Sequence, residues 1–121
     1  MSFSLIAAVA HDGAIGQQGG LPWGTLRHDR AWFRDLTLSA DPAKVASYWC
    51  EHAPDVDARL TAYARTPDNA VIMGRRTWES LPGPLAGRRN IVLQRYPFPV
   101  PCPGADLQCC AIETALYEAQ E

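Results

Sequence analysis

Asp29 is the residue of this chain whose position points most directly to chemistry. It stands among Leu26, Phe33 and Leu36, which recur at the spacing of one helix face over residues 26–37. A carboxyl group on the helix face that meets the core must either pair with a partner or stay protonated. A ligand with hydrogen-bond donors would be such a partner. The alternative is that Asp29 begins the helix and points at solvent, and the spacing leaves both open.

A second group of polar residues follows an apolar run that ends at residue 73. Residues 74–77, with the sequence Gly-Arg-Arg-Thr, lead from this run into a short helix that extends to Leu81. Backbone N–H groups at the helix start and two guanidinium groups would converge there on an anion such as phosphate. Arg95 adds a cation at the end of a later strand, where parallel sheets bind ligands. Alternatively, both arginines are solvated and Thr77 only caps the helix.

Apolar runs predict the strands that position these groups. Residues 3–10 are apolar on both faces and predict a buried central strand, and residues 69–74 and 90–94 predict two more. A glycine-rich loop over residues 11–24, of the kind that closes over ligands, follows the first strand. Strands alternate with helices, which predicts an α/β fold with a mixed, mainly parallel sheet flanked by helices.

Residues 38–68 predict an inserted helical segment that packs outside any pocket. One helix is expected after Asp41, which precedes a proline, and another after Asp55. Alternating prolines over residues 97–103 predict a surface connection, because proline cannot donate to a sheet. Residues 112–120 predict a final helix, with apolar positions on one face.

The composition excludes several classes of protein. The chain has 121 residues, 11 Lys+Arg against 13 Asp+Glu, and a net charge of −2, which predict a single domain over residues 1–121. No basic block is present, so a nucleic-acid partner is not expected. The N-terminal apolar run is too short for a signal or a membrane span, which favours the cytoplasm and no membrane partner.

The cysteines and histidines predict no metal site. Cys50, Cys102, Cys109 and Cys110 form no C-x-x-C pair, and the three histidines are scattered. Reduced thiols are expected, and an extracellular disulfide framework is the lesser alternative.

Several blocks of sequence occur together in one order. They are Ser4-Leu5-Ile6-Ala7-Ala8-Val9-Ala10, Ile15-Gly16, Leu21-Pro22-Trp23, Asp29-x-x-Trp32-Phe33, Val71-Ile72-Met73-Gly74-Arg75-x-Thr77-Trp78-Glu79-Ser80-Leu81-Pro82 and Pro84-Leu85-x-Gly87-Arg88-x-Asn90-Ile91-Val92-Leu93. This order, which extends to about Arg95, resembles the dihydrofolate reductase family. Separate blocks in the correct order are more discriminating than any one of them.

The resemblance implies an oxidoreductase of one-carbon metabolism that reduces 7,8-dihydrofolate to tetrahydrofolate with NADPH. It implies that Asp29 binds the 2-amino group and ring N–H of the pterin and helps the protonation at N5 that precedes hydride arrival at C6. Trp23 would lie beside Asp29, order water and pack the mobile loop. Arg88 would pair with the α-carboxylate of the glutamate tail, a role suited to a planar bidentate donor.

The resemblance also implies the remaining contacts. The substrate-binding residues would be Ile6, Ala7, Leu21, Asp29, Phe33, Leu81, Leu85 and Arg88. The cofactor-binding residues would be Ala8, Ile15, Gly16, Leu21, Gly74, Arg75, Arg76, Thr77, Gln94 and Arg95. A 2′-phosphate needs a positive partner, so Arg75 and Arg95 favour NADPH over NADH, and no metal is implied. The apolar members of both sets have an alternative role as plain core.

The sequence departs from the family at its end. The family continues beyond Glu121 with a buried strand, a Gly-Gly turn and further strands, so an incomplete domain with an unpaired apolar sheet edge is expected. A partner protein or a second chain would be involved if the missing strands were supplied in trans. The alternatives to a working reductase are a truncated, inactive fragment and a non-catalytic nucleotide-binding module.

Overall fold

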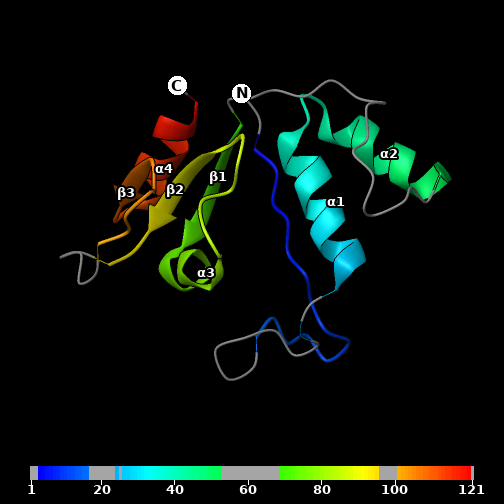
Figure 1. Ribbon diagram of the computed structural model, residues 1–121, viewed down its shortest axis with the longest axis horizontal. Coiled ribbons are helices and arrows are strands. Elements are labelled where there is room, and N and C mark those ends of the chain that lie inside the picture. The colour runs from blue at the N-terminus through cyan, green and yellow to red at the C-terminus, as the bar shows by residue number, and fades with distance from the viewer. Residues whose placement is uncertain (1–2, 17–23, 25, 53–68, 96–100, 121) are drawn as a thin grey trace.

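The computed structural model of the chain describes residues 3–16, 24, 26–52, 69–95 and 101–120 (Figure 1). The elements, in chain order, are α1 (Arg27–Leu38), α2 (Pro42–His52), β1 (Ala70–Gly74), α3 (Arg75–Ser80), β2 (Arg89–Leu93), β3 (Leu107–Cys109) and α4 (Ile112–Ala119). Within these ranges the strands form one parallel sheet in the order β1-β2-β3. The prediction of an α/β fold with a parallel sheet flanked by helices is confirmed.

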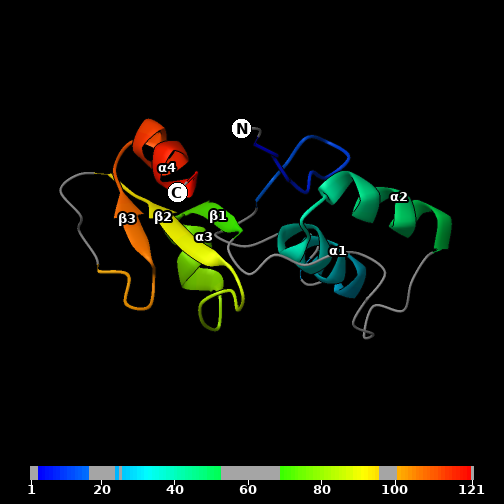
Figure 2. The same ribbon diagram turned by 90° about the horizontal axis from the view of Figure 1, so that it is seen from above.

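The core lies on both faces of β2, the central strand. Its Ile91 and Val92 are fully buried and, as neighbours in a strand, point to opposite faces. Val92 packs with Met73 and Cys102 on one face, whereas Ile91 packs with Cys109 and Ala115 of α4 on the other. Figure 2 shows α3 and α4 on these two sides of the sheet. Cover on both faces is what a parallel sheet requires.

The predicted strand over residues 3–10 is wrong. These residues are extended but form no strand, and Leu5 and Val9 are 97% and 57% exposed. In Figure 1 the segment runs between β1 and α1. A strand needs a partner for its backbone hydrogen bonds, and within the described residues no strand pairs with this segment or with the free edge of β1. The third strand is β3 instead, three residues long and too short for an apolar pattern to reveal it.

Except for the short helix α3, which begins at Arg75 where the sequence predicted a turn, the other predicted elements within the described residues agree with the structure to within a residue or two. The helices predicted over residues 26–37, after Asp41 and over residues 112–120 are α1, α2 and α4. Asp41 caps α2, because its Oδ1 accepts a hydrogen bond from the Lys44 N–H at 3.3 Å. The helix predicted after Asp55 lies outside the described residues, as does most of the proline-rich connection.

The described ranges contain neither a helix that could span a membrane nor a cluster of side chains that could bind a metal ion. No helix there is both long and apolar enough to cross a membrane. No group of three or more His, Cys, Asp or Glu side chains gathers there in a way that could hold a metal ion. None of the four cysteines, all of which the structure describes, forms a disulfide bond. Burial, together with the charge of Glu118, raises the pKa of the Cys109 thiol.

The indole of Trp49 connects α2 to α1. Trp49 Nε1 donates a hydrogen bond to Oδ2 of Asp35 at 3.0 Å, and Arg34 Nε reaches the other oxygen, Oδ1, at 2.9 Å. Asp35 is fully buried. The Trp49 ring also meets Trp32 edge to face, with 5.5 Å between ring centroids. The buried carboxylate therefore depends on α2 for one of its donors.

Trp49→Phe is expected to destabilise the fold by about 1–3 kcal/mol, because it leaves one oxygen of the buried Asp35 carboxylate without its donor. The free energy of unfolding in urea measures the change. Tyr48→Phe, on the same helix, removes a polar atom from a half-buried ring and is the matched control, expected within about 0.5 kcal/mol of the unchanged chain. Equal stabilities of the two variants would contradict the role of the indole.

Gly87 sits where the loop before β2 approaches the end of α1. Its φ is +74°, in the left-handed region, and a Cβ there would lie 3.2 Å from Cδ2 of Leu38. Gly87→Ala is expected to cost about 1–2 kcal/mol of stability, measured by thermal unfolding. At Gly83 an added Cβ meets no atom within 4 Å, so Gly83→Ala should leave the midpoint nearly unchanged. A larger loss for Gly83→Ala than for Gly87→Ala would refute this explanation.

Candidate functional site

The carboxyl ends of the strands mark one end of the molecule. Because the three strands are parallel, these ends meet at a single edge of the sheet. The start of α3, the first turn of α1 and residues 11–16 lie at this same end, the lower one in Figure 1. Ligands of α/β proteins bind at the carboxyl ends of parallel strands. The candidate site is therefore at this end and along α1.

One face of α1 presents an acid, an aromatic ring and a hydroxyl group. Asp29, Phe33 and Thr37 follow one another at a spacing of four residues, which places them on one helix face. All three are half-buried. The distance from Asp29 to Thr37 along the helix axis is about 12 Å. The face thus offers a row of contacts suited to an elongated ligand.

Helix α2 packs on a different face of α1. Its Trp49 packs on Trp32, bonds to Asp35 and meets the His28 ring at 6.0 Å between centroids. These partners lie, on average, more than a third of a turn round the helix from the row that begins at Asp29. The packing of α2 on α1 therefore leaves that row uncovered by α2.

Arg88 is fixed beside the far end of the row. Its Nε donates to the Ala86 carbonyl at 3.1 Å, and its Nη1 donates to Thr37 Oγ1 at 2.8 Å. Burial and then the neighbouring Arg34 lower the pKa of the Arg88 guanidinium. Within the described part of the chain no carboxylate forms an ion pair with Arg88. A partly desolvated cation beside a second cation favours binding of an anion.

The start of α3 is open and cationic. Gly74 ends β1, and the helix begins at once with Arg75, so both arginines belong to its first turn, not to a turn before the helix as the sequence predicted. No side chain caps α3, and a Cβ at Gly74 would meet no atom within 4 Å. Arg75 Nε lies 3.8 Å from Glu79 Oε1, whereas Arg76 and Thr77 are exposed.

Arg95, which follows β2, is also exposed. A helix start without a side-chain cap, with cations nearby, fits a phosphate group. This arrangement is compatible with the anion site that the sequence predicts there.

The remaining predicted site residues do not belong to the row on α1 or to the start of α3. Leu81 and Leu85 pack against the cluster of Met73, Val92 and Cys102, which favours their alternative role as core. The Gln94 amide donates to Gln108 Oε1 at 2.9 Å, so it ties β2 to β3. On the N-terminal segment, Ala8 is half-buried and the others are exposed: Ile6, Ala7, Ile15 and Gly16. The remaining two, Leu21 and Trp23, lie outside the described residues.

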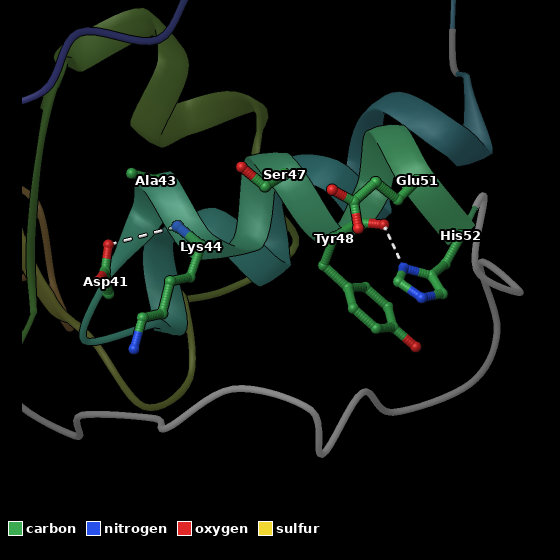
Figure 3. A pocket seen from close by; sticks show the side chains of 7 residues that line it. All are labelled: Asp41, Ala43, Lys44, Ser47, Tyr48, Glu51 and His52. Carbon is green, nitrogen blue, oxygen red and sulfur yellow. Dashed lines mark hydrogen bonds between the residues drawn. The ribbon is translucent and has the colours of Figure 1, made fainter.

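The structure also shows a surface hollow on α2, with a volume of about 370 Å³ (Figure 3). Its polar groups serve the helix itself: Asp41 caps it, and His52 Nδ1 lies 3.2 Å from the Tyr48 carbonyl while the two rings stack. The hollow is lined by Asp41, Ala43, Lys44, Ser47, Tyr48, Glu51 and His52. None of these residues belongs to the predicted site.

Two polar residues near the site, Thr37 and Asn69, were not predicted from the sequence. Thr37 bonds to Arg88, and Asn69 Nδ2 donates to the carbonyls of Thr37 and Ser39 at 2.9 and 2.7 Å. Asn69 thereby satisfies two carbonyls at the end of α1 and joins that end to the start of β1. The spacing of four residues from Asp29 through Phe33 to Thr37 was the signal that could have identified Thr37.

Comparisons with known proteins agree on one family. A family model described as dihydrofolate reductase matches residues 58–119. The dihydrofolate reductase of Encephalitozoon cuniculi is 40% identical over 98 residues, 78% of this chain and 42% of that protein. The dihydrofolate reductase of Mycobacterium tuberculosis is 36% identical over 94 residues, 75% of this chain and 40% of that protein.

The bifunctional dihydrofolate reductase-thymidylate synthase 2 of Arabidopsis thaliana is 35% identical over 120 residues, 95% of this chain and 17% of that protein. The chain thus spans less than half the length of each of these relatives.

Proposed function

The chain belongs to the dihydrofolate reductase family, and from this premise we propose that the protein reduces 7,8-dihydrofolate to tetrahydrofolate with NADPH. The observation that carries the proposal is the row on α1, with Asp29 at one end and Arg88 held beside the other. Dihydrofolate has the matching chemistry, since it carries ring N–H donors at one end and carboxylates at the other. The relatives named above are dihydrofolate reductases, which supports the same reaction.

Asp29 is the residue we assign to the proton step. Its carboxylate would accept hydrogen bonds from the 2-amino group and ring N–H of the pterin and help protonation at N5. A half-buried position in the first turn of α1 suits this role, because the helix dipole and the donors of the ligand would both stabilise the carboxylate. Phe33, one turn further on, would contact the ring system and exclude water from it.

Arg88 is the residue we assign to the glutamate tail. Two of its N–H groups are already used, by Ala86 and Thr37, which fixes the plane of the guanidinium. Within the described residues its Nη2 has no hydrogen-bond partner and is available to a carboxylate. Binding of an anion there would also relieve the repulsion between Arg88 and Arg34.

NADPH is the cofactor we propose for the open end of α3. The fit rests on the uncapped helix start, the open space above Gly74 and the exposed Arg76, Thr77 and Arg95. These residues would hold the phosphates of the dinucleotide, and Arg75 and Arg95 would favour the 2′-phosphate. When bound, NADPH supplies the hydride. The inserted segment 38–68 would support the site from outside, through the contact of Trp49 with α1.

The experiment that tests the proposal follows NADPH oxidation at 340 nm with dihydrofolate and the purified chain. Turnover that depends on both compounds supports it. Calorimetry with NADPH and with folate separates the alternatives: NADPH binding without folate binding would indicate a nucleotide-binding module, and binding of neither would indicate an inactive fragment. Either result would contradict the proposed reaction for this chain.

A further inference from the structure

Thr37 connects the far end of α1 to the loop before β2. Its hydroxyl group donates a hydrogen bond to the Phe33 carbonyl at 2.8 Å, one helical turn earlier. The hydroxyl proton is thereby committed to the helix, so the lone pairs of Oγ1 face outward as acceptors. Arg88 Nη1 donates to this oxygen at 2.8 Å across a separation of 51 residues in the chain. The threonine thus presents a neutral acceptor of fixed direction to a charged donor.

The backbone around Thr37 is held as firmly as its side chain. Asn69 Nδ2 donates to the Thr37 carbonyl at 2.9 Å and to the Ser39 carbonyl at 2.7 Å. Asn69 also accepts the Arg89 N–H on its own carbonyl at 2.8 Å. The hydroxyl group therefore has a fixed position relative to the sheet edge from which Arg88 projects.

The surroundings of the Arg88 guanidinium favour a neutral acceptor such as the Thr37 hydroxyl group. It is half-buried, Arg34 repels it, and among the described residues no carboxylate pairs with it. A neutral hydroxyl acceptor orients the group without neutralising it, whereas a carboxylate in the same place would compete with any incoming anion. The Ala86 carbonyl and Thr37 together fix two edges of the planar group and leave Nη2 uncovered.

We propose that Thr37 is a positioning residue that aims Arg88 at the carboxylate of the glutamyl tail, and so determines the preference for ligands that carry this tail. The inference rests on the proposed function, in that it takes folate as the ligand of Arg88. Thr37 touches no reacting atom in this role. Thr37 therefore affects the affinity for the glutamyl tail and does not affect the affinity for the pterin ring.

The test compares two ligands and several variants of the full chain. Folate carries the glutamyl group and pteroate lacks it, and their dissociation constants are measured by fluorescence titration. Thr37→Val keeps the shape of the side chain but removes the acceptor, and is expected to weaken folate about tenfold while leaving pteroate within about twofold. Thr37→Ser restores the hydroxyl group and should bind folate as the unchanged chain does. Thr37→Ala replaces Thr37→Val if the latter does not fold.

A double variant adds a second criterion. In the Arg88→Gln background, Thr37→Val is expected to cause no further loss of folate affinity, because the group that it aims is absent. Equal weakening of folate and pteroate by Thr37→Val, no weakening of either, or full additivity with Arg88→Gln would overturn the assignment. An unchanged chain that binds neither ligand would overturn it together with the proposed function. Folate binding with the expected pattern but without NADPH oxidation would leave Thr37 assigned and refute the reaction alone.

Discussion

Asp29→Asn is expected to lower kcat for dihydrofolate reduction by about 10²- to 10⁴-fold, the range that a positioned acid contributes to a proton transfer. Asparagine has nearly the same shape and can still bond to the ligand, but it cannot deliver or relay a proton. Asp29 is half-buried in the first turn of α1, and asparagine fits this position without rearrangement. The affinity for dihydrofolate should therefore fall less than kcat. Steady-state NADPH oxidation measures kcat and KM together.

The control for Asp29→Asn is Glu113→Gln, which also neutralises an acid in the first turn of a helix. Glu113 is exposed on α4, away from the row on α1, and its loss should leave kcat within about twofold. The pH profile gives a second readout, since turnover of the Asp29 variant should respond more steeply to falling pH when protons come from solvent. Retention of kcat in Asp29→Asn would exclude Asp29 from the proton step.

Arg88→Gln is the second substitution with a large expected effect: folate affinity should fall about 30-fold or more, because the carboxylate of the tail loses its charged, bidentate partner. Pteroate, which has no glutamyl group, should bind nearly as before. Arg30→Gln removes an exposed cation from α1 and is the matched control for the change in net charge. Fluorescence titration with both ligands gives the dissociation constants.

Arg88→Gln also removes the bond to Thr37, so its thermal unfolding has to be measured beside its binding. A variant that remains folded and loses folate and pteroate affinity to the same extent would show that Arg88 supports the fold and does not read the tail. A variant that binds folate normally would exclude the carboxylate contact.

The elements with strong periodic patterns could be predicted from the sequence. The helices that became α1 and α4 show apolar residues at helical spacing, and β1 and β2 are apolar runs of strand length. Asp41 followed by proline predicted the start of α2, and its carboxylate does cap that helix. In each of these cases the signal is local, so the pattern alone was sufficient.

Features that depend on distant partners could not be predicted. Residues 3–10 have the composition of a buried strand, but a strand forms only where another backbone pairs with it, and composition does not reveal that partner. Asp35 is an acid in a helix and would ordinarily be solvated, yet it is fully buried, and Trp49 of α2 supplies one of its donors. The short strand β3 has too few residues for alternation to appear.

In the candidate site, too, local patterns could be predicted from the sequence and contacts between distant residues could not. The helical spacing placed Asp29 and Phe33 on one face of α1, and the structure agrees. The contact of Thr37 with Arg88 joins residues far apart in the chain, and only the folded structure brings them together. Leu81 and Leu85 were predicted to line the ligand pocket, but apolar side chains fit a pocket wall and a core equally well. In the structure they pack against the core cluster of Met73, Val92 and Cys102.

The most direct test of the folate site is a titration of the ¹⁵N-labelled chain with folate, followed by amide chemical shifts. If the row on α1 and Arg88 form the site, the amides of Asp29, Phe33, Thr37 and Arg88 should shift together and saturate with one dissociation constant. The amides that line the hollow on α2 should stay in place. Shifts confined to that hollow, or no saturable shift along α1, would contradict a folate site on this helix.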